Sequence, residues 1–142
     1  MRTSVLKFVS NLMIVAFGAS LLAGCGGAST PATSATNLET ATDVADMLKE
    51  FCEAKKVGPA NIADLEKLDA SVNHPLGQAV VARQDFVVFW RVAVSPANGD
   101  TVLAYDKDTP SNGGAVVMGD GKVKSMTGEE FNAAKKAGTA KK

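Results

Sequence analysis

Cysteine and histidine are scarce in this sequence. Its 142 residues include two cysteines, Cys25 and Cys52, and one histidine, His74. A metal centre with several histidine or cysteine ligands is therefore excluded. No GxSxG, HExxH, CxxC or GxxxxGK[ST] pattern occurs either, so the sequence indicates none of the enzyme classes that carry these motifs. We predict that the protein is not an enzyme and has no cofactor, with Ca²⁺ as the one alternative.

An excess of charge of one sign is also missing. The 15 lysine and arginine residues balance the 15 aspartate and glutamate residues, which gives a formal net charge of zero. Because nucleic acids bind proteins through positive charge, we predict no nucleic-acid partner. No internal repeat is visible, and the length suits a single domain.

An apolar run near the N-terminus ends at the tetrapeptide LAGC, residues 22–25. A basic start, an apolar stretch too short to span a membrane and small residues before Cys25 resemble the signal peptide of bacterial lipoproteins. The resemblance implies cleavage after residue 24 and acylation of Cys25, which would anchor the protein in the cell envelope outside the cytoplasm. Gly26, in place of an aspartate, favours the outer membrane if the cell has one. The alternative is an ordinary secretory signal that leaves Cys25 unmodified.

Cleavage before Cys25 would remove Arg2 and Lys7, so that 13 basic side chains remain against 15 acidic ones, a net charge of −2. With Cys25 acylated, Cys52 has no partner for a disulfide within the chain. The segment after Cys25 is small, polar and uncharged, which is typical of flexible linkers. We predict a signal peptide over residues 1–24, a flexible tether over 25–37, one domain over 38–138 and a frayed tail over 139–142.

Apolar residues recur at three- and four-residue spacing from residue 41 to residue 52, which predicts an amphipathic helix. Thr40 and Asp43 resemble a capping box at its start, with aspartate in place of glutamate. Gly58 is expected to end it, together with the proline that follows. Two further segments are predicted here: a short helix with Ile62, Leu65 and Leu68 on one stripe, and a loop over residues 70–77.

The composition then changes to residues that favour strands. Strands are predicted over residues 79–82, 85–94, 101–105, 115–118 and 122–126. The segment 85–94 is apolar on both faces, so we expect a central strand that is at least partly covered on both sides. Gly119 to Gly121 supply a hairpin turn between the last two strands. Since the links between strands are short, the sheet should be antiparallel, with helices mainly on one face.

The last predicted element is a helix. Thr127 and Glu130 form a capping box that opens it, and Gly138 is expected to end it. The predicted fold class is therefore α+β: an N-terminal helix, a short second helix, an antiparallel sheet of about five strands and a short C-terminal helix.

The segment GGAVVMGDGKV, residues 113–123, resembles the ending of pilin-like secreted proteins that are abundant in planctomycete-type bacteria. That ending has a histidine, nine further residues and Asp-Gly, within a pattern like GGANVxFxDGxV. Asp120 and Gly121 match the Asp-Gly pair, whereas the histidine position falls on Pro110. The resemblance covers roughly residues 104–131 and implies a pilin-head-like sheet and an envelope location. Hairpin chemistry alone accounts for the same glycines.

Three polar residues gather in the predicted loop before residue 114, namely Asp106, Asp108 and Asn112. Oxygen ligands clustered in a loop are typical of Ca²⁺ sites, although the spacing is not that of an EF-hand. Asp120 would join them if the hairpin folds back. The two interpretations are a solvated turn and a weak divalent-cation site.

A second group of residues is a candidate binding patch. Phe89, Arg91, Leu103 and Tyr105 are expected to line the sheet face that the helices cover less well, and arginine and tyrosine are favoured at partner-binding patches. The alternatives are that these side chains belong to the core, or that an edge strand accepts a strand from another chain.

His74 and Cys52 each have a structural and a chemical interpretation. His74 precedes a proline, so it is either an ordinary loop residue or a base or ligand. Cys52 lies on the apolar stripe of the first helix, which indicates a buried structural cysteine. A nucleophilic role is less favoured, since a position late in a helix does not stabilise a thiolate.

These observations favour a membrane-anchored envelope lipoprotein of non-catalytic type. Its expected partners are the membrane, through the lipid on Cys25, and an envelope protein or a second copy in a secretion or pilus-like assembly. The alternative is a small-ligand or divalent-cation-binding lipoprotein that uses residues 106–112.

Overall fold

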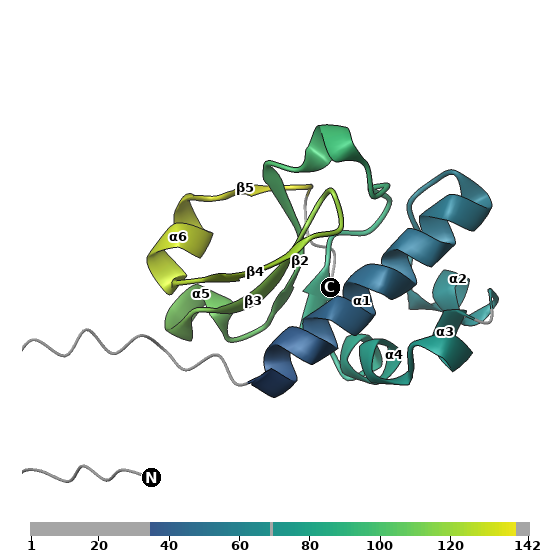
Figure 1. Ribbon diagram of the computed structural model, residues 1–142, viewed down its shortest axis with the longest axis horizontal. Helices are drawn as coiled ribbons and strands as arrows, with labels where there is room; N and C mark the ends of the chain where they lie inside the picture. The colour runs from purple at the N-terminus through teal and green to yellow at the C-terminus, as the bar shows by residue number, and fades with distance from the viewer. Residues whose placement is uncertain (1–34, 69, 139–142) are drawn as a thin grey trace, which may run out of the picture.

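The computed structural model describes residues 35–68 and 70–138 (Figure 1). Its helices are α1 (Ala35–Lys55), α2 (Ile62–Glu66), α3 (Ala70–Asn73), α4 (Pro75–Ala82), α5 (Thr109–Asn112) and α6 (Gly128–Ala133), with a 3₁₀ turn, η1, at Pro96–Asn98. Its strands are β1 (Phe86–Val88), β2 (Thr101–Asp106), β3 (Gly114–Met118), β4 (Val123–Met126) and β5 (Lys135–Lys136). None of these described helices has both the length and the apolar character needed to cross a bilayer. The predicted signal peptide, Cys25 and the tail over 139–142 lie outside the described residues.

The strands form one five-stranded sheet. β1, β2, β3 and β4 are neighbours in that order, and each pair is antiparallel. β5 runs parallel to β2 and pairs with residues 101–102, whereas β1 pairs with residues 104–106. The prediction of an α+β fold with about five strands and a short C-terminal helix is confirmed, with β5 as the one parallel addition.

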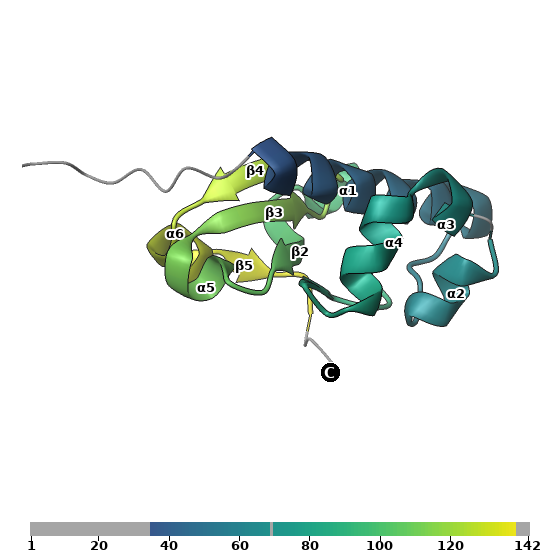
Figure 2. The ribbon, with the colours of Figure 1, turned by 90° about the horizontal axis from the view of Figure 1, so that it is seen from below.

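Helix α1 is packed between the sheet and a group of short helices. It lies beside β3 and β4, while α2, α3 and α4 contact it beyond the sheet (Figures 1 and 2). The helix buries Val44, Met47 and Leu48 almost completely, and β3 is buried along its whole length. Removal of this apolar surface from water is the main term that stabilises the arrangement.

The N-terminal helix is longer than the sequence predicts. It begins at Ala35, within the predicted tether, so that Thr40 and Asp43 lie inside the helix. The predicted capping box at its start is therefore wrong. The Asp43 carboxylate instead accepts a hydrogen bond from the Gly77 N–H at 2.7 Å, so that it caps α4 from a neighbouring helix.

The segment 70–82, predicted as a loop and a short strand, is helical. Pro75 occupies the first turn of α4, where its missing N–H is no loss. Val80 and Val81 favour a strand by propensity, but the burial of Val81 against the rest of the core decides for the helix. Gly77 allows the close approach of α4 to α1, since a Cβ there would lie 2.9 Å from the Val44 nitrogen.

The segment 85–94 is a strand only over its first part, and β1 is an edge strand rather than a central one. The ladder continues to the Phe89 N–H, which donates to Leu103 O at 2.9 Å. Arg91 then adopts a left-handed conformation, with φ at 66°, and its N–H donates to Pro59 O. The backbone turns away from β2 at this point. The apolar residues that follow Phe89 are therefore packed against the core without pairing in the sheet.

The C-terminal predictions follow local chemistry and are largely confirmed. β3 and β4 form the expected hairpin, and Gly121 takes a φ of 78° in its turn. Thr127 and Glu130 form both hydrogen bonds of the capping box, at 3.2 and 2.8 Å. The helix is shorter than predicted, because α6 ends at Ala133 and the next residues form β5.

Candidate functional site

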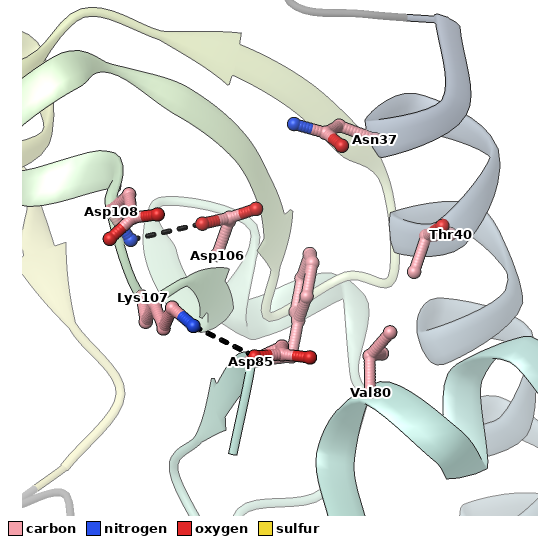
Figure 3. Close-up of a pocket in the computed structure, with 8 residues that line it drawn as sticks. Asn37, Thr40, Val80, Asp85, Asp106, Lys107 and Asp108 are labelled. Atoms are coloured by element: carbon pink, nitrogen blue, oxygen red, sulfur yellow. Dashed lines mark hydrogen bonds and ion pairs between the residues drawn. The ribbon is translucent and has the colours of Figure 1, made fainter. Parts of the chain in front are cut away.

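A pocket of about 230 Å³ opens where α1, α4, β1 and the end of β2 meet (Figure 3). Its charged groups are the side chains of Asp85, Asp106, Lys107 and Asp108. The rest of its wall comes from Asn37, Thr40, Val80 and Phe86. The pocket therefore brings together residues from four separate elements around three carboxylates and one amine.

Asp85 carries the strongest electrostatic interactions in this pocket. It accepts hydrogen bonds from Lys107 Nζ at 2.8 Å and from Arg83 Nε at 2.9 Å. The hydrogen bond from Lys107, followed by that from Arg83, lowers the pKa of the Asp85 carboxyl, and the same pair raises the pKa of Lys107. Asp85 and Lys107 therefore stay charged as a pair at neutral pH.

The structure brings together two of the three predicted cation ligands. Asp106 and Asp108 line the same pocket, and Asp106 Oδ1 accepts the Asp108 N–H at 2.9 Å (Figure 3). Asn112, the last residue of α5, is not part of the pocket wall. Asp120 lies at the far end of β3, where it pairs with Lys122 at 2.7 Å. Among residues 35–68 and 70–138, no three or more metal-ligating side chains are grouped around one ion position.

The predicted sheet-face patch is wrong for two of its members. Phe89 and Leu103 are 5 % and 1 % exposed, so they belong to the core. Tyr105 is half-buried, with its ring centroid 4.6 Å from that of Phe131 and 5.9 Å from that of Phe89. The C-terminal helix covers these rings through Phe131, a contact that the sequence does not indicate. Only Arg91 of the four is exposed.

The single histidine is part of a polar network between α1 and the α3–α4 corner. His74 Nδ1 lies 2.9 Å from Asp43 Oδ1, and Nε2 lies 3.2 Å from Glu50 Oε2. Asn73 Nδ2 also donates to Glu50 Oε1, at 3.3 Å. The interpretation of His74 as an ordinary loop residue is therefore wrong, since its side chain is only 16 % exposed.

Sequence reasoning missed this network, although a signal for it exists. Asp43 and Glu50 are seven residues apart, which places them on one face of a helix two turns from each other. His74 directly precedes a proline that begins a helix. A carboxylate-bearing helix face and a polar residue at a helix start are natural partners, but the residue types alone do not show that they meet.

Replacement of Asp43 tests whether this network holds α4 in place. Asp43→Ala removes the acceptor of the Gly77 N–H and the closer partner of His74, so we expect a loss of about 2 kcal/mol in the free energy of unfolding. Urea denaturation measures the change. Asp46→Ala is the matched control, because Asp46 has only a half-exposed pair with Lys49 and its loss should cost less than about 0.5 kcal/mol. Equal effects of the two substitutions would show that Asp43 does not cap α4.

Cys52 is buried, as the sequence predicts, with 8 % of its surface exposed. Its Sγ accepts a hydrogen bond from the Val94 N–H at 3.4 Å. Burial raises the pKa of the thiol, and the hydrogen bond from Val94 offsets only part of that shift. The thiol form therefore prevails at neutral pH, which fits a structural role better than a nucleophilic one.

A second hollow lies between α1 and the α3–α4 corner, beside the histidine network. Its volume is about 430 Å³. We call it the corner groove, and its wall consists of Glu39, Thr42, Asp43, Asp46, Asn73, His74 and Leu76. Comparisons of the chain with protein-family models, with curated proteins and with solved structures found no match.

Proposed function

We propose that the protein is a non-catalytic envelope lipoprotein that acts by protein–protein contact, in a secretion or pilus-like assembly. The tetrapeptide LAGC at residues 22–25 supports the anchor. Helix α1 begins at Ala35, ten residues after Cys25. Ten residues span at most about 35 Å, so an acylated Cys25 would keep the domain next to the bilayer surface.

The proposed protein contact is based on exposed apolar side chains that line the corner groove or are next in sequence to residues that line it. Val72 on α3 is 74 % exposed, and Leu76 on α4, which lines the groove, is 50 % exposed. Leu38, which precedes the groove residue Glu39 on α1, is 43 % exposed. Exposed apolar side chains in a hollow with a polar rim, as Leu76 is here, are typical of surfaces that bind another protein.

A pull-down from detergent-solubilised envelope tests this proposal. The bait is the full chain, as wild type and as Leu76→Ser, with Val57→Ser as a matched control that is 58 % exposed but outside the groove. We expect a stoichiometric envelope protein or a second copy with the wild type and the control. Recovery with Leu76→Ser should fall about tenfold or more, which corresponds to a loss of about 1.4 kcal/mol. Recovery of the bait alone, or of the same partner with all three baits, would contradict the proposal.

A second proposal is binding of a divalent cation, which the position of Asp106 and Asp108 in one pocket favours. A cation that binds only the folded state raises its stability by RT ln(1 + [L]/Kd), which is about 1.4 kcal/mol at ten times Kd. This proposal predicts a rise of several degrees in Tm with millimolar Ca²⁺, and its loss in Asp108→Asn. An unchanged Tm would remove it.

A further inference from the structure

One face of α1 has an excess of negative charge. Its acidic residues follow one another at four- and three-residue spacing, which places them on the same side of the helix; they are Glu39, Asp43, Asp46 and Glu50. The first three line the corner groove, and Lys49 pairs with Asp46 at 3.0 Å. The sequences of α3 and α4 contain no charged residue. The α1 wall of the groove is therefore acidic.

The groove combines open carboxylates with an apolar side chain. Glu39 is exposed, and the Asp46 side chain is 47 % exposed, whereas Asp43 is already bound by His74. Leu76, on the same wall, is 50 % exposed. A side chain that fits this surface needs an apolar stem and a positively charged end, and lysine has both.

The chain itself contains a segment of this chemistry. Residues 135–142, KKAGTAKK, include four lysines and no acidic residue, and we call them the lysine segment. The first two lysines are bound within their own copy. Lys135 pairs with Asp100 at 3.3 Å, and Lys136 Nζ donates to two backbone carbonyl oxygens. The other two lysines of the segment follow the described residues.

We propose that the partner in the corner groove is a second copy of this chain, whose Lys141 and Lys142 bind the carboxylates of Glu39 and Asp46. This inference rests on the proposed function, since it names the partner of the same groove. Charge complementarity supports it, because the acidic surface and the basic segment belong to the same sequence. The lysine stems would cover the exposed part of Leu76.

The groove and the lysine segment belong to different parts of the domain. β5 pairs with β2, and the Ala137 N–H extends this contact by donating to Val102 O at 2.9 Å. The groove lies instead between α1 and the α3–α4 corner, and Figure 2 shows β5 and α3 well separated. Each copy can therefore bind one neighbour with its groove and another with its segment. Such a heterologous contact builds rings or open filaments.

The contact is expected to be weak between free copies, because exposed ion pairs contribute little each. Anchoring through Cys25 would confine the copies to one membrane surface and raise their effective concentration. Salt should weaken the association, since the Debye length falls from about 10 Å at about 0.1 M to about 3 Å at about 1 M.

Zero-length crosslinking tests the contact directly. A carbodiimide joins a lysine amine to a carboxylate only where the two groups touch. The sample is an equal mixture of ¹⁴N- and ¹⁵N-labelled full chain in mild detergent, at about millimolar concentration, which is typical of tethered modules. We expect mass spectrometry to find links from Lys141 or Lys142 to Glu39 or Asp46, in pairs with like and with mixed labels. Links confined to like-labelled pairs, or no links to these carboxylates, would overturn the proposal.

Charge reversal gives a second readout, which is the association constant from sedimentation. Lys141→Glu with Lys142→Glu should lower it about tenfold. Glu39→Lys with Asp46→Lys should restore it when added to the same chain, because the charges are then exchanged. Restoration also shows that the first loss is not caused by misfolding. If the fourfold variant stays as weak as the twofold one, the proposed pairing is wrong.

Two exposed charges outside both surfaces serve as matched controls. Lys124 lies on β4, and Glu53 lies on α1 but is not part of the groove wall. Lys124→Glu and Glu53→Lys should leave the association constant within about twofold of the wild type. An equal loss in the controls would mean that overall charge, rather than this contact, governs association, and would contradict the proposal.

The failure of this inference can be told apart from the failure of the proposed function. A different envelope protein may be recovered that depends on Leu76 but not on Lys141 and Lys142. In that case the groove is a protein-binding surface, and the second copy as its occupant is wrong. If no partner of any kind depends on Leu76, both proposals are wrong.

Discussion

Cys25→Ser is expected to abolish the incorporation of labelled fatty acid into the protein. If residues 22–25 are the lipobox that we propose, the thiol of Cys25 is the atom that accepts the diacylglyceryl group, and a serine hydroxyl does not replace it. Two acyl chains buried at about 0.8 kcal/mol per CH₂ contribute on the order of 20 kcal/mol to membrane binding. Because the variant has no thiol at position 25, the loss of label should be complete. Metabolic labelling followed by gel electrophoresis measures it.

The second cysteine supplies the control for this experiment. Cys52→Ser makes the same chemical change at a buried position in α1, where the side chain only accepts a hydrogen bond from Val94. Its label should equal that of the wild type. If the wild type itself carries no label, the anchor proposal is wrong and the N-terminal segment is an ordinary secretory signal.

Phe89→Ala is expected to lower the free energy of unfolding by about 3–5 kcal/mol. Phe89 is 5 % exposed and contacts Tyr105, and truncation of a buried phenylalanine leaves a cavity that its neighbours fill only partly. For a domain of marginal stability this loss is a large part of the total. Chemical denaturation followed by the fluorescence of Trp90 measures it.

Arg91→Ala is the matched substitution in the same segment. Arg91 is exposed, and within the described residues no hydrogen bond or ion pair of its side chain is found, so its truncation should change stability by less than about 0.5 kcal/mol. A small effect of Phe89→Ala, with loss of a binding partner instead, would restore the interpretation of Phe89 as part of an exposed patch.

The parts of the fold that the sequence predicts correctly are those with local causes. The hairpin turn at Gly119 to Gly121 and the Thr127–Glu130 capping box are short-range hydrogen-bond patterns that any surroundings would allow. The helix stripe with Val44 and Leu48 repeats over enough turns to be unambiguous. These features follow from residue type and spacing within a few positions.

The parts that it misses depend on distant residues. Val80 and Val81 have strand propensity, and only their packing beside α1 makes them helical. The strand over 85–94 ends early because the Arg91 N–H is bound by Pro59, which lies 32 residues away. The intrinsic preference of a residue for helix or strand is weaker than the effect of such tertiary contacts.

The candidate sites also include features with local causes and features that depend on distant residues. Asp106 and Asp108 are two residues apart, so their place in one pocket could be predicted, whereas the contribution of Asp85 to it could not. In the Asp43–His74–Glu50 network, the histidine is 31 and 24 residues away from its two partners in sequence. Residue spacing describes the faces of one helix, but it does not say which face meets which loop.

Site-specific photo-crosslinking in intact cells tests whether the domain binds a partner through the corner groove, as we propose. A photoreactive amino acid replaces Val72, which is 74 % exposed and precedes the groove residue Asn73, or Val57, which is 58 % exposed and not part of the groove wall. We predict one discrete adduct with an envelope protein or a second copy from position 72, and little from position 57. No adduct from position 72, or the same adducts from both positions, would contradict binding of a partner through the corner groove.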